Sequence, residues 1–295
     1  MRTPLLEYAG DKLEWSRIYL KDETKQTTGS FKFRSVFRRL NSLPARDALF
    51  VAASTGNHGL AVAASADFKG VPSRIYVPER TPQAKIKALS SFNATVIEVN
   101  GDYLDCVMTA KRWAEENGAH YVESFEDPDI IDGHRSLCRE IDEALAEFDA
   151  CFVPVGGGGL LASALGHWLD PPRTVIGVEA ACTAAMTQSL AAGTLVRVPP
   201  YRSIAEGISL PSVGWLPFSI CERAMPQMTQ VNEEQIRRAM KLLWGYHSIR
   251  AEGAGAASLA GALQVAGRGR CCICLISGGN IDPEEFQRLI SLEQI

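Results

Sequence analysis

Strand-like apolar runs alternate with helix-like patterns along most of the 295 residues of this chain. Such alternation favours parallel sheets covered by helices on both faces, with ligands at the carboxyl ends of the strands. We therefore predict an α/β fold. Apolar periodicity predicts strands over 18–23, 48–53, 74–77, 94–99, 121–122, 150–155, 174–178 and 271–276, and helices over 57–68, 81–91, 102–117, 130–147, 160–169, 183–191, 232–246, 253–266 and 283–292.

Composition and charge exclude several classes of protein. Apolar residues make up 46% and charged residues 22%, as in a globular protein. A net charge of -4 gives no electrostatic footprint for nucleic acid or an anionic membrane. The chain has neither an apolar leader at its start nor an uncharged apolar run long enough to span a membrane, and its eight cysteines lack zinc-site spacing. We expect a cytoplasmic protein with reduced cysteines and a small-molecule partner.

Lys32 stands between Phe31 and Phe33 just after a glycine. It falls in the first turn of a predicted helix, for which Ser30 is the expected N-cap. The positive end of the helix dipole and the apolar neighbours both disfavour an ammonium and lower the pKa of such a lysine. A lysine of this kind can form a Schiff base with an aldehyde cofactor. The alternative is a lysine whose stem simply packs along the two rings.

Four consecutive glycines, Gly156, Gly157, Gly158 and Gly159, follow an apolar strand and open a helix. The run suits a close approach to the backbone, and free N–H groups at a helix start form an anion cradle that phosphate usually occupies. The spacing matches neither the dinucleotide-binding fingerprint nor a P-loop. A tight turn without a ligand is the alternative.

Two further polar turns follow predicted strands. In one, the hydroxyls of Ser54 and Thr55, the side-chain amide of Asn57 and the N–H groups of the helix start could hold a carboxylate, although a simple N-cap is the alternative. His58 in the same turn, taken alone, is more often a structural hydrogen-bonding histidine than a base. In the other, Ser277 opens a Ser-Gly-Gly-Asn turn. A phosphate cradle, a carboxylate nest and a Schiff-base lysine together suggest one active site.

These stretches resemble the fold type II (tryptophan synthase β-like) family of pyridoxal-phosphate enzymes, in its threonine/serine dehydratase and serine racemase branch. The matching stretches are 26–34, 54–59, 154–160, 205–207, 252–256 and 277–280, and they occur in the family's order over nearly the whole chain. The resemblance implies two domains, with 1–47 and 127–295 as a large cofactor-binding domain and 48–126 as a smaller inserted domain that closes over the substrate. It also implies a homodimer, because relatives are commonly dimers.

The resemblance implies that Lys32 holds pyridoxal 5'-phosphate as a Schiff base and removes the Cα proton of the substrate. The remaining expected cofactor contacts are Phe31 beside the ring, Asn57 at the ring 3'-hydroxyl, Gly156, Gly157, Gly158 and Gly159 at the phosphate, Ser277 at the pyridine nitrogen, and the backbone at Gly207. The expected substrate contacts are Ser54, Thr55, Gly56 and His58 around the carboxylate, Glu252 near the substrate or the ring, and Arg135.

A serine at the pyridine nitrogen does not hold that nitrogen protonated, which favours early loss of a β-leaving group. The expected reaction is therefore β-elimination from threonine, serine or a hydroxylated acidic or modified amino acid, giving a 2-oxo acid and ammonia. Racemisation and β-replacement are the alternatives with the same cofactor. A phosphate- or nucleotide-binding protein without covalent chemistry and a silent scaffold are alternatives of other classes.

Several positions depart from the pattern of the branch. Thr55 stands where racemases carry a serine that acts as acid or base on the opposite ring face, so racemisation stays open. Glu179 matches one carboxylate of a metal site, but the second falls on Ala185, so no metal is expected. Arg135 replaces a small turn residue and could bind a second substrate carboxylate or pair with a nearby acid. No regulatory domain is evident in the sequence, so amino-acid feedback is not expected.

Overall fold

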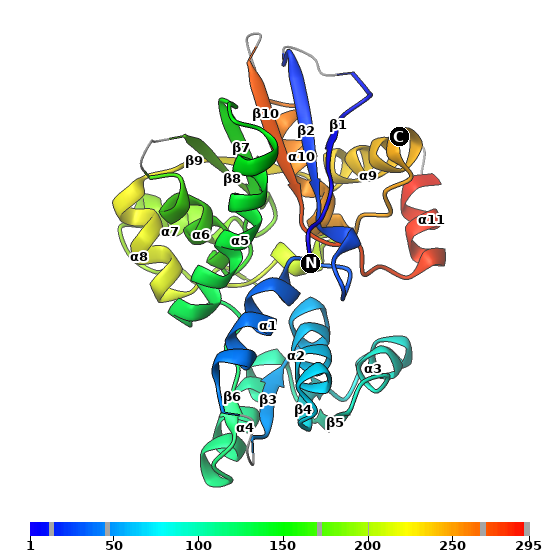
Figure 1. Ribbon diagram of the computed structural model, residues 1–295, viewed down its shortest axis with the longest axis vertical. Helices are drawn as coiled ribbons and strands as arrows, with labels where there is room; N and C mark the ends of the chain where they lie inside the picture. Colours follow the sequence, from blue (N-terminus) through cyan, green and yellow to red (C-terminus); the bar gives the residue numbers. More distant parts are fainter. Residues whose placement is uncertain (12–14, 45–47, 170–172, 200, 266–269, 292–295) are drawn as a thin grey trace. The chain divides into compact units, whose positions relative to one another are not determined.

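A computed structural model describes residues 1–11, 15–44, 48–169, 173–199, 201–265 and 270–291. Its contacts divide the chain into a larger unit, Met1–Phe31 with His134–Ile295, and a smaller unit, Lys32–Gly133 (Figure 1). The expected boundaries were 47/48 and 126/127, whereas this division falls at 31/32 and 133/134. Helix α1 (Lys32–Ser42) accounts for much of the difference, because it packs against α2 (Asn57–Lys69) in the smaller unit.

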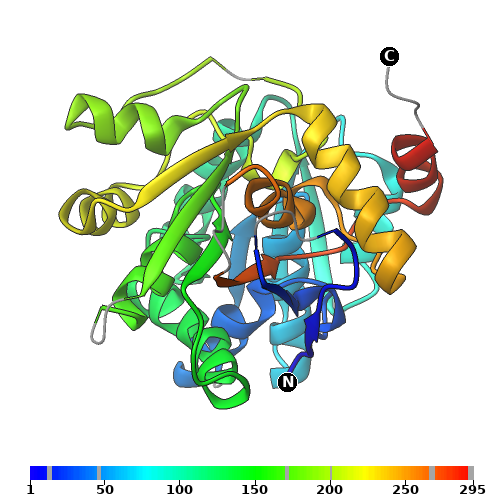
Figure 2. The ribbon, with the colours of Figure 1, turned by 90° about the horizontal axis from the view of Figure 1, so that it is seen from above.

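The larger unit contains a six-stranded sheet in the order β1-β2-β10-β7-β8-β9 (Figures 1 and 2). All neighbouring strands run parallel except β1, which pairs antiparallel with β2 at the edge. The strands are β1 (Leu5–Glu7), β2 (Arg17–Asp22), β7 (Ala150–Pro154), β8 (Thr174–Ala180), β9 (Gln227–Val231) and β10 (Cys271–Ile276).

Helices cover both faces of this sheet, because side chains alternate between two cores along each strand. Phe152 belongs to the core formed with α9, α10 and α11, whereas its neighbours Cys151 and Val153 belong to the core formed with α5 to α8. The helices are α5 (Pro128–Ala144, in this unit from His134 onward), α6 (Gly159–His167), α7 (Ala185–Ala192), α8 (Trp215–Ala224), α9 (Glu233–His247), α10 (Gly253–Ala262) and α11 (Pro283–Ser291), with short 3-10 turns η1 (Glu23–Lys25) and η2 (Glu206–Ile208).

The smaller unit is built on a four-stranded parallel sheet in the order β5-β4-β3-β6. Helices α1 and α2 share one core with this sheet, and α4 shares the other. The elements not yet bounded are β3 (Phe50–Ala53), β4 (Ser73–Pro78), α3 (Gln83–Leu89), β5 (Ala94–Val99), α4 (Tyr103–Glu116) and β6 (His120–Tyr121).

The α/β alternation predicted from the sequence is confirmed, with two differences. The antiparallel strand β1 was not expected, and the segment 192–230, whose periodicity is too weak to predict an element, contains η2, α8 and most of β9. Proline and glycine flank these short elements and interrupt any long apolar pattern. The predicted ends of two helices, at 266 and 292, lie outside the described residues.

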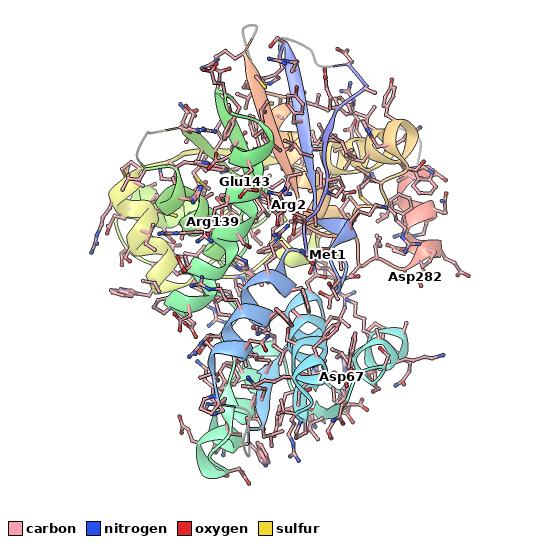
Figure 3. All side chains as sticks on the ribbon, in the orientation of Figure 1. Met1, Arg2, Asp67, Arg139, Glu143 and Asp282 are labelled. Carbon is pink, nitrogen blue, oxygen red and sulfur yellow. The ribbon has the colours of Figure 1, made fainter. Side chains whose placement is uncertain are left out.

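The beginning of the chain is fastened to α5 by charged groups. The buried Lys21 amine donates to the Thr3 carbonyl at 2.7 Å and to Glu140 Oε2 at 2.6 Å. One turn along α5, Glu143 forms an ion pair with Arg2 (Figure 3). Edge strand β1 therefore follows a segment with its own side-chain anchors.

Searched over the described stretches of chain, the structure contains no helix of a length and apolarity that would cross a lipid bilayer. The eight cysteines are free thiols. Cys151, Cys271, Cys272 and Cys274 lie in strands, and the other four cysteines lie in helices or a turn.

Candidate active site

Helix α1 begins at Lys32, so this residue lies in the first turn, as the sequence predicts. The Lys32 amine donates to the carbonyl oxygen of Ser124 at 2.8 Å and to its hydroxyl at 2.9 Å. The residue keeps some accessible surface, yet burial of the amine lowers the pKa of Lys32 to about 8. The expected cap at Ser30 is wrong, because the buried Ser30 hydroxyl has no hydrogen-bond partner and the residue instead bridges Gly278.

The polar turn 54–58 lies at the carboxyl end of β3, where α2 begins at Asn57. Gly56 donates its N–H to the Ser54 hydroxyl at 3.2 Å, and α2 has no side-chain cap. The side chain of Thr55 is partly exposed. First-turn N–H groups of an uncapped helix are suited to a carboxylate, which is the ligand predicted for this turn.

His58 is buried in the same turn, and its Nε2 lies 2.9 Å from the Val122 carbonyl. Burial, and then the charge of Lys32, lower the pKa of His58 to about 3, against the opposing effect of the Val122 bond. The ring is therefore neutral. Because a carbonyl only accepts, Nε2 carries the proton and the buried, unpartnered Nδ1 is an acceptor. The His58 ring thus offers no donor to a carboxylate, and any contact from this residue would come from its backbone N–H.

The glycine loop joins β7 to α6 in the larger unit. A Cβ at Gly156 would lie 2.6 Å from the carbonyl oxygen of Gly207. Gly158 is the N-cap of α6 with φ of 91°, in the left-handed region that glycine tolerates. Because α6 has no side-chain cap, its first N–H groups suit a phosphate, which is the fit expected for a pyridoxal-phosphate site.

The remaining candidates of the larger unit form a continuous series of neighbours beside this loop. A Cβ at Gly207 would lie 3.1 Å from the Ala254 side chain, and the Ala254 carbonyl accepts from the Ser277 hydroxyl at 3.4 Å. The Ser277 carbonyl in turn accepts from the Phe31 N–H at 3.0 Å. Glu252 is the N-cap residue of α10, and its N–H donates to the Gly278 carbonyl at 3.1 Å. The structure thus brings Gly156, Gly207, Ser277 and Phe31 into one neighbourhood.

Arg135 and Glu179 have other surroundings. A Cβ at Gly166 would lie 2.8 Å from Arg135 Nη2. Gly166 is about two helical turns along α6 from Gly159, so the Arg135 guanidinium lies beside α6 at that distance from the glycine loop.

The buried Glu179 carboxylate accepts from the backbone of Met186 and Thr187 at the start of α7. It is thus a helix-capping carboxylate. In the parts of the chain that the structure describes, no three His, Cys, Asp or Glu side chains gather as metal ligands would.

Sequence reasoning missed Ser124 and Val122, which hold Lys32 and His58. Both follow β6, a strand of two residues in a parallel sheet, and no motif marks them. The applicable signal is positional, because polar groups after the carboxyl ends of strands in one parallel sheet meet at one edge. Ser54 and Ser124 follow the neighbouring strands β3 and β6 and fit this rule.

Comparison with known proteins is consistent with these features. The L-threonine ammonia-lyase of Thermotoga maritima is 36% identical over 93% of this chain and 70% of its own length. The L-threo-3-hydroxyaspartate ammonia-lyase of Saccharomyces cerevisiae is 31% identical over 98% of this chain and 91% of its own. The solved structure of maize serine racemase has a TM-score of 0.91 at 26% identity, covering 98% of this chain and 91% of that one.

A family model described as pyridoxal-phosphate dependent enzyme matches residues 1–276. This match confirms the family resemblance and the cofactor expected from the sequence, and the solved structure confirms the fold class. The residue roles implied by the resemblance stay predictions. The chain belongs to the family of pyridoxal-phosphate dependent enzymes.

Proposed function

We propose that this protein is an ammonia-lyase that removes the β-hydroxyl group and the amino group of a β-hydroxy amino acid, giving a 2-oxo acid and ammonia. The observation that carries the proposal is the Lys32 amine, whose pKa is lowered to about 8 at the start of α1. The two ammonia-lyase relatives, each at least 31% identical over most of this chain, support the same reaction class.

The residues of this chain fit the cofactor in chemical type. In this proposal the uncapped start of α6 would hold the phosphate, Ser277 would face the pyridine nitrogen, and the Lys32 amine would hold the aldehyde carbon. Asn57 and Phe31 are the proposed partners of the ring. When bound, pyridoxal phosphate withdraws electrons from the substrate Cα and so makes its proton acidic.

Lys32 would take the Cα proton on its Nζ. With a pKa of about 8, about a tenth of the lysine is neutral at pH 7, whereas an ordinary lysine is almost wholly protonated. The neutral His58 ring beside it adds no positive charge that would suppress protonation of the amine during turnover. The turn around Ser54, Thr55 and Gly56 would hold the substrate carboxylate through N–H and hydroxyl groups.

The side chain of the substrate decides which β-hydroxy amino acid the enzyme would use. L-Threonine, L-serine and L-threo-3-hydroxyaspartate all carry the required β-hydroxyl, and two of them are named in the relatives. Arg135 would recognise a second carboxylate if the substrate has one, so Arg135→Gln should then weaken hydroxyaspartate turnover far more than threonine turnover. Equal losses on both substrates would instead indicate the structural role.

Racemisation is the second candidate, because Thr55 keeps a hydroxyl at the racemase position and the maize serine racemase structure is similar. Chiral chromatography of the amino acid left after partial turnover separates the two reactions.

We also propose a cytoplasmic homodimer. Sedimentation velocity would test the dimer, and cell fractionation would test the location.

The test of the main proposal is the visible absorption spectrum of the purified protein, supplied with pyridoxal phosphate, before and after each candidate substrate. We expect a band of lysine-bound cofactor that one substrate perturbs, with release of its 2-oxo acid. Lys32→Ala should abolish both, whereas Lys87→Ala, on the exposed surface of α3, should keep both. A band that persists in Lys32→Ala would overturn the assignment of the lysine, and product formation only with an added thiol would indicate β-replacement.

A further inference from the structure

The three residues after β6, Val122 to Ser124, form a short ledge in the smaller unit. The N–H of Val122 donates to the Val51 carbonyl at 2.8 Å, which fixes the ledge to β3. Lys111 of α4 pairs with Glu123 at 2.5 Å. The ledge is therefore held in place by β3 on one side and by α4 on the other.

The ledge contacts both titratable groups of the candidate site in this unit. The Val122 carbonyl accepts from the His58 ring at 2.9 Å, and the Ser124 carbonyl and hydroxyl accept from the Lys32 amine at 2.8 and 2.9 Å. Ser124 thus contributes two oxygens to one amine. Only the hydroxyl can also donate, because a carbonyl oxygen is solely an acceptor.

We propose that Ser124 is a positioning residue for Lys32, whose hydroxyl follows the amine through both of its protonation states. When Lys32 holds the proton taken from Cα, the Ser124 hydroxyl accepts from the ammonium. When Lys32 is neutral, the hydroxyl can turn and donate to the nitrogen lone pair. The amine is thereby held in one place whenever it is not attached to the cofactor. The catalytic meaning of this inference rests on the proposed function of Lys32.

The charged and titratable groups near Lys32 determine how its titration is interpreted. His58 of α2 is neutral over the working range because burial lowers its pKa to about 3, and Glu123 of the ledge is paired with Lys111. Hydrogen bonds to an ion are stronger than those to a neutral group, so loss of the Ser124 hydroxyl destabilises the ammonium more than the amine. Ser124→Ala is therefore expected to lower the pKa of Lys32 by about half a unit to one unit.

The direct test is trace acetylation of the full-length protein freed of cofactor, over a series of pH values, with the Lys32 peptide quantified by mass spectrometry. Only the neutral amine reacts, so the midpoint of labelling reports the pKa of Lys32. We expect Ser124→Ala to move the midpoint to lower pH and Ser124→Thr, which keeps a hydroxyl, to restore it. Ser91→Ala is the matched control, because that hydroxyl is exposed and bonds Ala88 within its own turn.

The same variants are then compared as loaded enzymes. We expect Ser124→Ala to lower kcat about ten-fold with little change in KM, because the substrate is still bound but the base is poorly held. An unchanged labelling midpoint in a folded Ser124→Ala protein would overturn the proposal. The labelling needs neither cofactor nor substrate, so its result stands even if the lyase activity is not found, and the two failures are distinguishable.

Discussion

Thr187 donates both its backbone N–H, at 2.9 Å, and its hydroxyl, at 2.6 Å, to the carboxylate of Glu179. Met186 donates a third hydrogen bond at 2.7 Å, so the first turn of α7 is built over one buried acid. Burial raises the pKa of Glu179, and these hydrogen bonds oppose that effect. The Glu179 carboxylate therefore caps the start of a helix.

Replacement of Glu179 is therefore expected to destabilise the fold. Glu179→Ala leaves three donors without their acceptor and should lower the free energy of unfolding by about 3 kcal/mol. Thr187→Val removes only the hydroxyl donor and should cost about 1 kcal/mol. Urea unfolding followed by circular dichroism measures both, and equal losses in the two variants would contradict a capping role for the carboxylate.

The stability of the protein should depend on His58 in acid. Burial lowers the pKa of His58 to about 3, while the unfolded chain has the ordinary value near 6.5. Between these two pH values the His58 ring is protonated in the unfolded state and neutral in the folded state, so the free energy of unfolding rises with pH. The His58 contribution is fully present above pH 6.5 and is lost toward pH 3, by at most roughly 1.4 kcal/mol per pH unit.

The measurement is the free energy of urea unfolding at several pH values from 7 to 4, for the wild-type protein and His58→Gln. The wild-type protein should lose stability more steeply, because glutamine does not titrate. Parallel pH dependences would mean that the folded ring accepts a proton as readily as the unfolded one.

Much of the fold and of the site was predictable where local chemistry determines the structure. The glycine loop was predicted from an apolar strand followed by four glycines, and the place of Lys32 in the first turn of α1 follows from apolar periodicity. The reason why position 156 requires a glycine is not visible in the sequence. The backbone of Gly207, far away in the chain, occupies the space of a side chain there.

The misses share a dependence on tertiary contacts. Ser30 has the chemistry of an N-cap, but pairing with Gly278 buries its hydroxyl away from any partner. Ser124 becomes visible only when β6 pairs with β3, since a strand of two residues has no recognisable period. Strand β9 was hidden in a segment interrupted by prolines, and its position beside β8 is set by pairing.

Backbone crowding at the glycine loop gives a prediction for cofactor affinity. A Cβ at Gly156 would lie 2.6 Å from the Gly207 carbonyl and 3.2 Å from the Ile208 Cα, and neither backbone group can rotate aside. Gly156→Ala should therefore shift the loop and weaken pyridoxal-phosphate binding at least ten-fold. Gly193→Ala is the matched control, because Gly193 also lies in this unit and a Cβ there has no neighbour within 4 Å.

Fluorescence titration of the cofactor-free proteins with pyridoxal phosphate gives the two dissociation constants. Gly193 has φ of 63°, so its variant should lose about 1 kcal/mol of stability while keeping the wild-type affinity. Similar affinities for Gly156→Ala and the wild-type protein would show that the loop tolerates a side chain at this point.

Loss of the buried charge of Lys21 should lower the free energy of unfolding more than loss of a surface ion pair. Lys21 is 1% exposed, and its partners include the Glu140 carboxylate at 2.6 Å and the Thr3 carbonyl at 2.7 Å. Lys21→Met removes the cation that faces the Glu140 carboxylate, whose side chain is 13% exposed, and leaves that carboxylate with the Thr3 N–H, at 3.2 Å, among its donors. The expected loss in the free energy of unfolding is about 3 kcal/mol.

A double-mutant cycle separates the ion pair from simple loss of packing. Glu140→Met added to Lys21→Met removes the carboxylate that has lost its cation, so the double variant should regain at least about 1 kcal/mol over Lys21→Met alone. Arg288→Ala at the exposed pair with Glu285 is the control and should change stability little. Strictly additive losses at Lys21 and Glu140 would mean that the two charges stabilise the N-terminal segment independently, and the Thr3 carbonyl would then be the partner of Lys21 that matters.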